Sequence, residues 1–342
     1  MEIVSSSNDA VTVLIVEDDP AMLVALRDIL EGAGYNVSTA ANGKKALEAI
    51  GKGPPSLILS DIGMPVMDGI QLFEEVRKLP IGTAIPFIFL TARGTREDIF
   101  AGKSLGADDY ITKPITSHEL LSAVRARLQR ANELMVTQLK SAYKASLRAL
   151  ANAIEARDRY TRGHVERVNA FAQCLATDLD WDIERKDSLE FGAILHDIGK
   201  ISVGEAILTK PGPLDEQEWN DMRKHPVVGA RMIQDIPYLA SAVPMVLYHH
   251  ERWDGSGYPQ GLKAESIPEE ARLLAVVDAF DAMTSDRPYR SALPLETTHE
   301  LIHQESGKQF DPTMVKAFSS AWDRGEIQNI FHKSKDRRAE SL

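Results

Sequence analysis

The chain has 342 residues, of which 44% are hydrophobic and 26% charged, and its formal net charge at pH 7 is -11. This length predicts two domains rather than one, and the acidic balance argues against binding to nucleic acid backbones. No stretch of the sequence is long and apolar enough to cross a membrane, and the first residues lack a signal-peptide pattern. We therefore expect a cytoplasmic protein that binds neither DNA nor membranes.

The first 130 residues alternate between strand and helix patterns. Short apolar runs predict five strands, over residues 11–16, 35–40, 56–60, 86–92 and 107–112. Amphipathic patterns predict the intervening helices, over residues 21–34, 43–51, 69–79 and 96–106, and a further helix from Thr116. Five strands alternating with five helices predict an α/β fold, a doubly wound five-stranded parallel sheet of the flavodoxin-like type.

A long helical pattern follows, because residues 116–157 contain almost no glycine or proline. It predicts one long helix or two joined helices, with apolar residues three and four positions apart, as in Leu121, Val124 and Leu128. Two interpretations remain open: a connecting helix that pairs with a second copy of the chain, giving a homodimer, or a helix that packs on its own domain. We set the first domain at 9–130 and the connector at 131–150.

From residue 151 the strand pattern disappears. The remaining segments are helical and are interrupted by proline- and glycine-rich turns such as residues 253–262. We expect an all-α domain over 151–325, followed by a tail over 326–342 that is polar from Lys333 onward.

Acidic residues stand where the predicted strands end. Glu17 and Asp18 follow the first strand, Asp61 follows the third, Thr91 ends the fourth and Lys113 follows the fifth. The ends of parallel strands meet at one edge of the sheet, where clustered carboxylates suit Mg²⁺. A carboxylate beside Mg²⁺ can accept a phosphoryl group, whose oxygens the lysine and threonine can hold. Helix capping explains any one of these acids, but not the whole set.

The motifs "LIVEDDP", "DIGMPVMDG", "LTA" and "DDYITKP" stand in this order over residues 11 to about 130. In this respect the chain resembles response-regulator receiver domains. The resemblance implies that Asp61 is the phosphoacceptor of a cognate sensor histidine kinase and that Glu17, Asp18 and Asp61 hold Mg²⁺. The family often has aspartate at the position of Glu17. The resemblance also implies three switch residues: Thr91, Lys113 and Tyr110.

Histidines and aspartates form an ordered series in the second half of the chain: His164, His196–Asp197, His225, His249–His250 and Asp278. Successive groups are 24 to 32 residues apart, which is roughly one helix and its connection, so each helix can bring ligands to one centre. Asp278 lies inside an apolar run, where an unpaired carboxylate costs several kcal/mol unless a partner such as a metal ion offsets it.

Seven such ligands are too many for one metal ion and suit two. Imidazoles and carboxylates without thiolates fit Fe, Mn, Ni, Co or Zn, and Asp197 is the expected bridging carboxylate. Binuclear centres of this kind hydrolyse phosphate esters. Lys200 lies about one turn beyond His196 and can place its ammonium group on a phosphate. Arg287 and Arg290 can hold a second phosphate, although a role as solvated surface charges remains open for them.

The motifs "DRYTRGH", "LHDIGKI", "HHERWDGSGYP" and "SDRPYR" stand in the order found in the HD-GYP family, which the chain resembles over about 148–322. This resemblance implies a metal-dependent phosphodiesterase that converts cyclic di-GMP to pGpG or GMP, with Asp197 and Lys200 at the reacting phosphate. Some members carry a glutamate at the position of Tyr160, which supports a third metal ion. We therefore predict a two-metal centre with pGpG as the main product and inefficient hydrolysis on to GMP.

Three alternatives accompany this main hypothesis of a phosphodiesterase controlled through Asp61. The second domain could be a signalling module that binds cyclic di-GMP, or partner proteins through the loop of Gly255, Gly257, Tyr258 and Pro259, without turnover. It could also be a phosphohydrolase for other nucleotides. Finally, residues 299–303 match the HExxH pattern of zinc proteases, but a helix in which His299 and His303 face solvent or a neighbour is the preferred interpretation.

Overall fold

The computed structural model describes residues 11–91, 109–157, 163–286 and 291–340. The chain divides into two compact units, Met1–Lys140 and Ser141–Leu342, which are described separately below. Among the described residues, no helix combines the length and the hydropathy that crossing a membrane requires.

The first unit contains a five-stranded parallel sheet, as the sequence predicted. Its strands are β1 (Thr12–Val16), β2 (Asn36–Ala40), β3 (Leu57–Asp61), β4 (Phe87–Thr91) and β5 (Asp109–Thr112). They pair in the order β2-β1-β3-β4-β5. The central strands are apolar at almost every position because helices cover both faces of the sheet.

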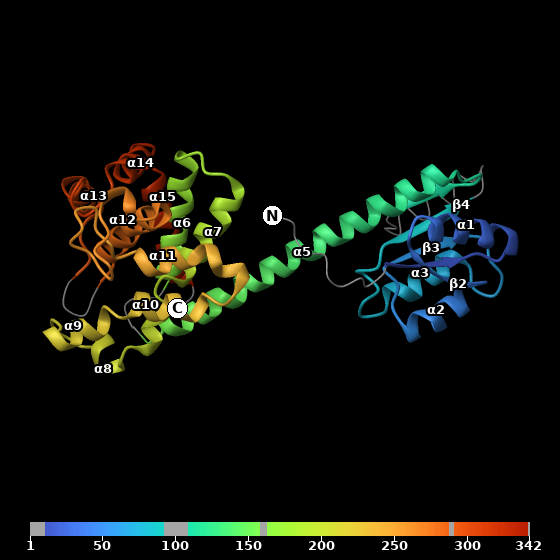
Figure 1. Cartoon of the computed structure of the whole chain (residues 1–342), viewed down its shortest axis with the longest axis horizontal. Helices are drawn as coiled ribbons and strands as arrows, with labels where there is room; N and C mark the ends of the chain where they lie inside the picture. The colour runs from blue at the N-terminus through green and yellow to red at the C-terminus, as the bar shows by residue number, and fades with distance from the viewer. Residues whose placement is uncertain (1–10, 92–108, 158–162, 287–290, 341–342) are drawn as a thin grey trace. The chain divides into compact units, whose positions relative to one another are not determined.

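Helices cover the two faces in pairs, as Figure 1 shows. They are α1 (Pro20–Gly32), α2 (Gly43–Lys52), α3 (Gly69–Arg77) and the first turns of α5 (Ser117–Glu155). Alternate residues of a strand point to opposite faces, so Leu14 and Val16 pack with α2 and α3, whereas Val13 and Ile15 pack with α1 and α5. The helix predicted over 96–106 lies outside the described residues.

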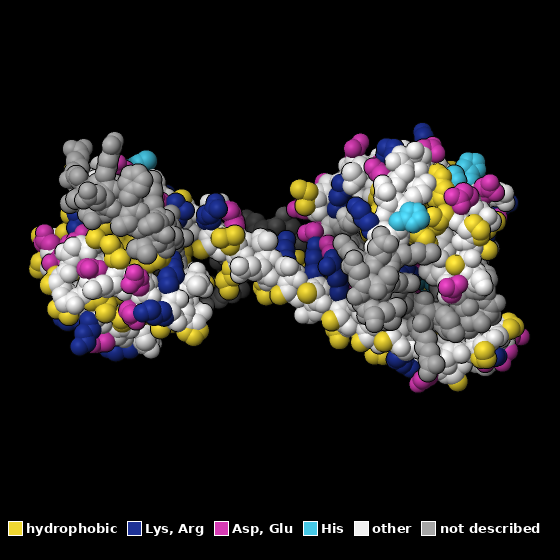
Figure 2. Space-filling model, turned by 180° about the vertical axis from the view of Figure 1, so that it is seen from behind, with side chains coloured by type: hydrophobic (Ala, Val, Ile, Leu, Met, Phe, Trp, Pro, Cys, Tyr) yellow, Lys and Arg dark blue, Asp and Glu magenta, His cyan; other side chains and the backbone are white. Residues whose placement is uncertain are grey.

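Helix α5 is continuous over 39 residues, which decides between one long helix and two joined ones. Its first turns bury Leu120 and Val124 in the core of the first unit, and Leu147 belongs to the core of the second. The middle of the helix is exposed, including Met135 and Leu139 at 69% and 68%, and Figure 2 shows hydrophobic side chains on its surface. Pairing with a second copy of the chain stays a prediction.

The second unit is helical, as predicted, and an isolated bridge between Ser306 and Phe310 is the only β-pairing among its described residues. Its α-helices are α6 (His164–Asp178), α7 (Ile183–Leu195), α8 (Glu205–Leu208), α9 (Glu216–Met222), α10 (His225–Ile233), α11 (Val243–Tyr248), α12 (Glu269–Thr284), α13 (Leu295–Gln304), α14 (Pro312–Asp323) and α15 (Glu326–Glu340). Short 3-10 helices span Ile198–Ser202, Pro237–Ala242 and Ala264–Ser266. One hydrophobic core joins α6, α7, α11, α12 and α14.

The boundary at 326, where the tail was expected to begin, is wrong, because α15 starts at Glu326 and packs against α6 and α14. Ile327 and Phe331 are buried in the core. These two apolar residues are four positions apart, which places both on one face of a helix.

Candidate functional site

The seven predicted ligands of the second unit lie together. They form two groups, and within each group the ligand atoms are within 4.8 Å of one another. The groups are Asp197, His225, His249 and His250, and His164, His196 and Asp278. Most of them stand at helix ends: His164 begins α6, His225 begins α10, and His196 and His249 cap α7 and α11. Packing of the apolar helix faces therefore gathers these ends at one place.

Three of the histidines are oriented by the same local hydrogen bond. The Nδ1 atoms of His196, His225 and His249 lie 2.8, 2.7 and 2.9 Å from the carbonyl oxygens of Ala193, Met222 and Val246. A carbonyl oxygen only accepts hydrogen bonds, so each Nδ1 carries the proton and donates it. Each Nε2 atom is then left with a free lone pair, as in the form of histidine that binds metals.

His164 is oriented differently, by a side-chain carboxylate instead of a backbone carbonyl group. Its Nδ1 atom lies 2.7 Å from Oδ2 of Asp281, a residue that is 1% exposed. Arg167 also donates to Asp281, with Nη2 2.8 Å from Oδ2. Although burial raises the pKa of Asp281, its hydrogen bonds with His164 and Arg167 lower it to about 2. Asp281 is therefore an ionised partner that fixes the ring of His164.

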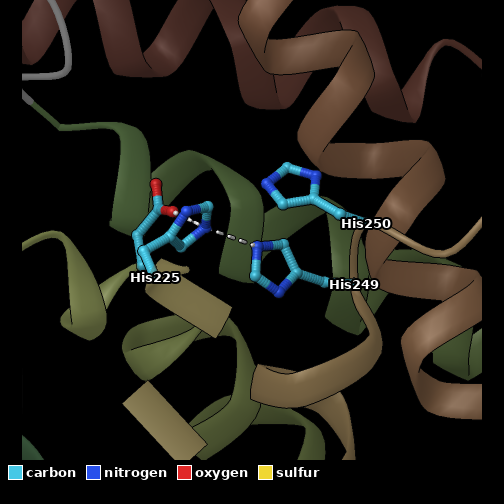
Figure 3. Close-up of side chains that lie close together, drawn as sticks. His225, His249 and His250 are labelled. Carbon is cyan, nitrogen blue, oxygen red and sulfur yellow. Dashed lines mark hydrogen bonds and ion pairs between the residues drawn. The ribbon is translucent and has the colours of Figure 1, made fainter. Parts of the chain in front are cut away.

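The free imidazole nitrogens face one another across short distances. Nε2 of His164 lies 3.2 Å from Nε2 of His196, and Nε2 of His225 lies 3.4 Å from Nε2 of His249. Figure 3 shows the rings of His225, His249 and His250 converging on a common space. Lone pairs that face one another in a buried place repel unless a cation lies between them. The donor set and its orientation thus fit a metal ion in each group.

Asp197 stands between the two groups. Its Oδ1 lies 3.3 Å from Nε2 of His225, and its Oδ2 lies 3.5 Å from Nε2 of His196. Nζ of Lys200 lies 2.6 Å from the same Oδ2. Burial raises the pKa of Asp197, but the charges of Lys200 and His196 bring it well below its usual value. One oxygen toward each group is the placement that a bridging carboxylate requires.

Two of the candidate ligand histidines favour the neutral form. Burial, together with the neighbouring His225, lowers the pKa of His250 to about 3, and burial and the adjacent His250 lower the pKa of His249 as well. Only neutral imidazole binds a metal ion, so no proton has to leave these rings at neutral pH.

The glycine-rich loop that follows His250 is fixed by Glu251, which is buried. The carboxylate of Glu251 accepts the backbone N–H groups of Gln260, Gly261 and Leu262, at 2.7, 3.1 and 3.0 Å. A Cβ atom on Gly257 would lie 2.3 Å from the backbone nitrogen of Arg252, so this position requires glycine. The loop places the ring of Tyr258 4.8 Å from the ring of His250. The loop therefore shapes the site, and its tyrosine touches a candidate ligand.

A cleft of about 870 Å³ opens beside the two groups. Asp197, Lys200, His225, His250 and Asp278 line one part of it. The volume lies within the range of sites that enclose small molecules, so the candidate metal groups can be reached by a substrate.

The predicted acidic site of the first unit is also brought together. The ligand atoms of Glu17, Asp18 and Asp61 lie within 4.8 Å of one another. Lys113 binds into this cluster, with Nζ 2.8 Å from Oε2 of Glu17 and 3.1 Å from Oδ1 of Asp61. Burial, more than any other cause, raises the pKa of Glu17. The cluster thus contains one exposed carboxylate, that of Asp18, and the ammonium group of Lys113 pairs with the other two.

Thr91 and Tyr110 lie on neighbouring strands of the sheet, β4 and β5. Thr91 is buried at the end of β4, and its hydroxyl group has no hydrogen-bond partner among the described residues. Tyr110 stacks on Phe89 with the ring centroids 5.5 Å apart, and its buried hydroxyl group is likewise unpaired within the described part of the chain.

Other predicted residues have different outcomes. Arg287, Arg290 and Tyr160 lie outside the described residues. In the HExxH segment, His299 stacks on Trp322 with the ring centroids 4.5 Å apart, and His303 is exposed. Among the described residues this segment belongs to no group of potential metal ligands, so His299 serves packing.

Known proteins agree with this architecture. Family models match residues 13–125 as "Response regulator receiver domain" and residues 148–314 as "HD domain". The "Cyclic di-GMP phosphodiesterase" of Thermotoga maritima is 34% identical over 95% of this chain and 94% of its own length. The "Cyclic di-GMP phosphodiesterase response regulator RpfG" of Xanthomonas campestris is 34% identical over 93% and 89% of the two chains. A shorter match, the "3'3'-cGAMP-specific phosphodiesterase 2" of Vibrio cholerae, is 35% identical over 55% of this chain and 37% of that protein. The chain belongs to the family of response regulators in which a receiver domain is followed by an HD domain.

Proposed function

We propose that this protein is a response regulator whose helical unit hydrolyses cyclic di-GMP to pGpG with a binuclear metal centre. The observation that carries this proposal is the convergence of four imidazole Nε2 atoms and two carboxylates beside an open cleft. Two relatives that match nearly the whole chain are named for action on cyclic di-GMP, which supports this choice of substrate.

The two groups of ligands divide the proposed metal ions between them. His225, His249 and His250 would hold one ion, His164, His196 and Asp278 the other, and Asp197 would bridge them. The metals, of the Fe, Mn, Ni, Co or Zn type, would supply Lewis acidity and activate water for attack on phosphorus.

The chain itself orients the reacting groups. Asp281 and the helical carbonyl groups keep each Nε2 lone pair directed into the centre. Lys200 lies in the wall of the cleft beside Asp197 and would donate hydrogen bonds to the phosphate oxygens. Arg287 and Arg290 would contact a second phosphate. Tyr160 stands where a third-metal glutamate occurs in other members, which favours two metal ions and pGpG as the product.

The direct test is incubation of metal-reconstituted protein with cyclic di-GMP, with the products separated by chromatography. We expect pGpG from the wild type and a loss of at least about a thousandfold in rate for His196→Ala/Asp197→Ala. A parallel reaction with 3'3'-cGAMP tests the substrate class. If the wild type binds cyclic di-GMP but does not hydrolyse it, the helical unit is a binding module and not an enzyme. Full turnover by the double variant would exclude the proposed catalytic site.

For the first unit we propose phosphorylation of Asp61 by a sensor histidine kinase, with Mg²⁺ held by Glu17, Asp18 and Asp61. Thr91, Lys113 and Tyr110 would respond to the phosphate. The signal would pass along α5, which is one continuous helix from Ser117 to Glu155. Its exposed Leu134, Met135 and Leu139 would form the contact of a homodimer.

This regulation is tested by comparing turnover of the wild type and Asp61→Asn, each with and without a small phosphoryl donor. We expect the donor to change the rate of the wild type alone. Equal rates in wild-type protein that mass spectrometry shows to be phosphorylated would remove the regulatory proposal and leave the phosphodiesterase intact.

A further inference from the structure

The cleft has a second part, which is lined by aromatic rings with Arg223 beside them. Trp219, in helix α9, lines this part and is 44% exposed. The guanidinium carbon of Arg223 lies 5.7 Å from the ring centroid of Trp219 and 5.6 Å from that of Tyr258. The ring of Tyr258 in turn lies 4.8 Å from that of His250. A row of aromatic rings and one cation thus leads from a candidate metal ligand to an exposed tryptophan.

Trp219 does not pack into the hydrophobic core. Helix α9 buries none of its residues, and an exposed tryptophan at a cleft is typical of a binding surface rather than of packing. Other apolar residues, Ile207, Pro213 and Leu214, line the same cleft. This part of the cleft therefore suits a flat ligand group with two apolar faces.

Helix α9 is nonetheless held in place. Asp215 and Glu218 form a capping box at its beginning, and Lys210 lies 2.5 Å from the carboxylate of Glu218. At its other end, the carbonyl oxygen of Met222 accepts the Nδ1 hydrogen of His225. The helix that carries Trp219 is thus tied directly to a candidate metal ligand, which fixes the tryptophan relative to the metal centre.

We propose that Trp219 and Arg223 form a subsite for one guanine base of the dinucleotide. The base would stack on Trp219, and Arg223 would donate hydrogen bonds to the O6 and N7 acceptors of guanine. Adenine presents a donor in place of O6, so Arg223 would favour guanine. This inference rests on the proposed function, because it names the part of the site that recognises the base of that substrate.

The test uses full-length, metal-loaded protein and the variants Trp219→Ala, Trp219→Phe and Arg223→Gln. Lys224→Ala is the matched control, because Lys224 is an exposed basic neighbour paired with Asp221. We expect KM for cyclic di-GMP to rise about tenfold for Trp219→Ala and Arg223→Gln, with a smaller fall in kcat. Trp219→Phe should raise KM less than Trp219→Ala, because a phenyl ring also stacks. Metal content, measured by mass spectrometry, should be equal in all of them.

The Kd for pGpG, measured by calorimetry on the same proteins, separates this inference from the proposed function. If the wild type binds pGpG and Trp219→Ala weakens that binding about tenfold, the subsite stands even if cyclic di-GMP is not hydrolysed. Equal Kd values for wild type, Trp219→Ala and Arg223→Gln, or no binding of pGpG to the wild type, would overturn it. Should Trp219→Ala lose metal, Arg223→Gln decides, since Arg223 is exposed.

A separate measurement tests the preference for guanine over adenine. The ratio of kcat/KM for cyclic di-GMP to that for cyclic di-AMP should fall about tenfold in Arg223→Gln and stay constant in Lys224→Ala. An unchanged ratio in Arg223→Gln would exclude Arg223 as the residue that reads the base edge.

Discussion

The two candidate metal sites of this chain are built in opposite ways. In the receiver unit, the carboxylates stand at strand ends, and Lys113 already binds both Glu17 and Asp61. In the helical unit, imidazole lone pairs face one another inside a centre of buried histidines. The lysine of the receiver site thus pairs with two of its carboxylates, whereas Lys200 of the helical centre pairs with Asp197, and a metal ion would have to neutralise the facing imidazole lone pairs. Metal binding should therefore be required for the stability of the helical unit, but only for the function of the receiver unit.

Metal removal should give the largest effect and tests this contrast directly. Stripping the protein with a chelator should lower the Tm of the helical unit by about 10 °C, because a ligand at a thousand times its Kd stabilises by about 4 kcal/mol. The transition of the receiver unit should move far less. Scanning calorimetry with and without chelator checks this, and equal shifts of the two transitions would break the comparison.

The variant Asp281→Asn should weaken metal binding about 10- to 100-fold, because the amide no longer carries the charge that orients His164. Calorimetric titration of the stripped protein with Mn²⁺ measures the affinity. Asp182→Asn is the matched control, since Asp182 caps α7 and asparagine caps equally well. Unchanged affinity in Asp281→Asn would mean that His164 keeps its orientation without a carboxylate.

Removal of the Lys113 side chain should make the stability of the receiver depend on a metal ion, as we expect for the helical centre. Lys113→Ala leaves the buried Glu17 beside Asp61 without its cation, and we expect a loss of about 1–3 kcal/mol in unfolding free energy. Mg²⁺ should restore part of this loss in the variant, while it hardly changes the Tm of the wild type. A variant whose Tm does not respond to Mg²⁺ would contradict the idea that lysine and metal substitute for one another here.

The smallest effect concerns Cys174, which reports on packing in the helical unit. Burial, with the neighbouring Glu326, raises the pKa of its thiol to about 12. At pH 8 the thiolate fraction is then about a thousandfold smaller than for a thiol of pKa 9. Cys174 is the only cysteine, so alkylation by iodoacetamide followed by mass spectrometry is unambiguous. We expect slow modification of the metal-loaded protein and faster modification after chelation. An equal rate in the two samples would mean that metal does not stabilise this unit.

The sequence predicted the strands, the helical second unit and the residues that converge, because strand ends and helix spacing follow from local patterns. Asp281 and Arg167 were missed, since a polar residue one turn after Asp278 looks like any helix residue until α6 and α12 pack together. The only signal was a second aspartate in the segment "VVDAFDAM". The first part of the tail was misread because Ile327 and Phe331 form a single short apolar stripe. The role of Glu251 depends on how its loop folds back, which no local pattern encodes.

The most direct test of the whole account is a stepwise metal titration of the stripped protein, with pGpG formation from cyclic di-GMP followed at each step. We predict no turnover without metal and a rise in rate that is complete at two equivalents per helical unit. Asp197→Ala should bind fewer ions and release no pGpG. Full turnover by the stripped protein, or full activity at one equivalent, would contradict a binuclear centre bridged by Asp197.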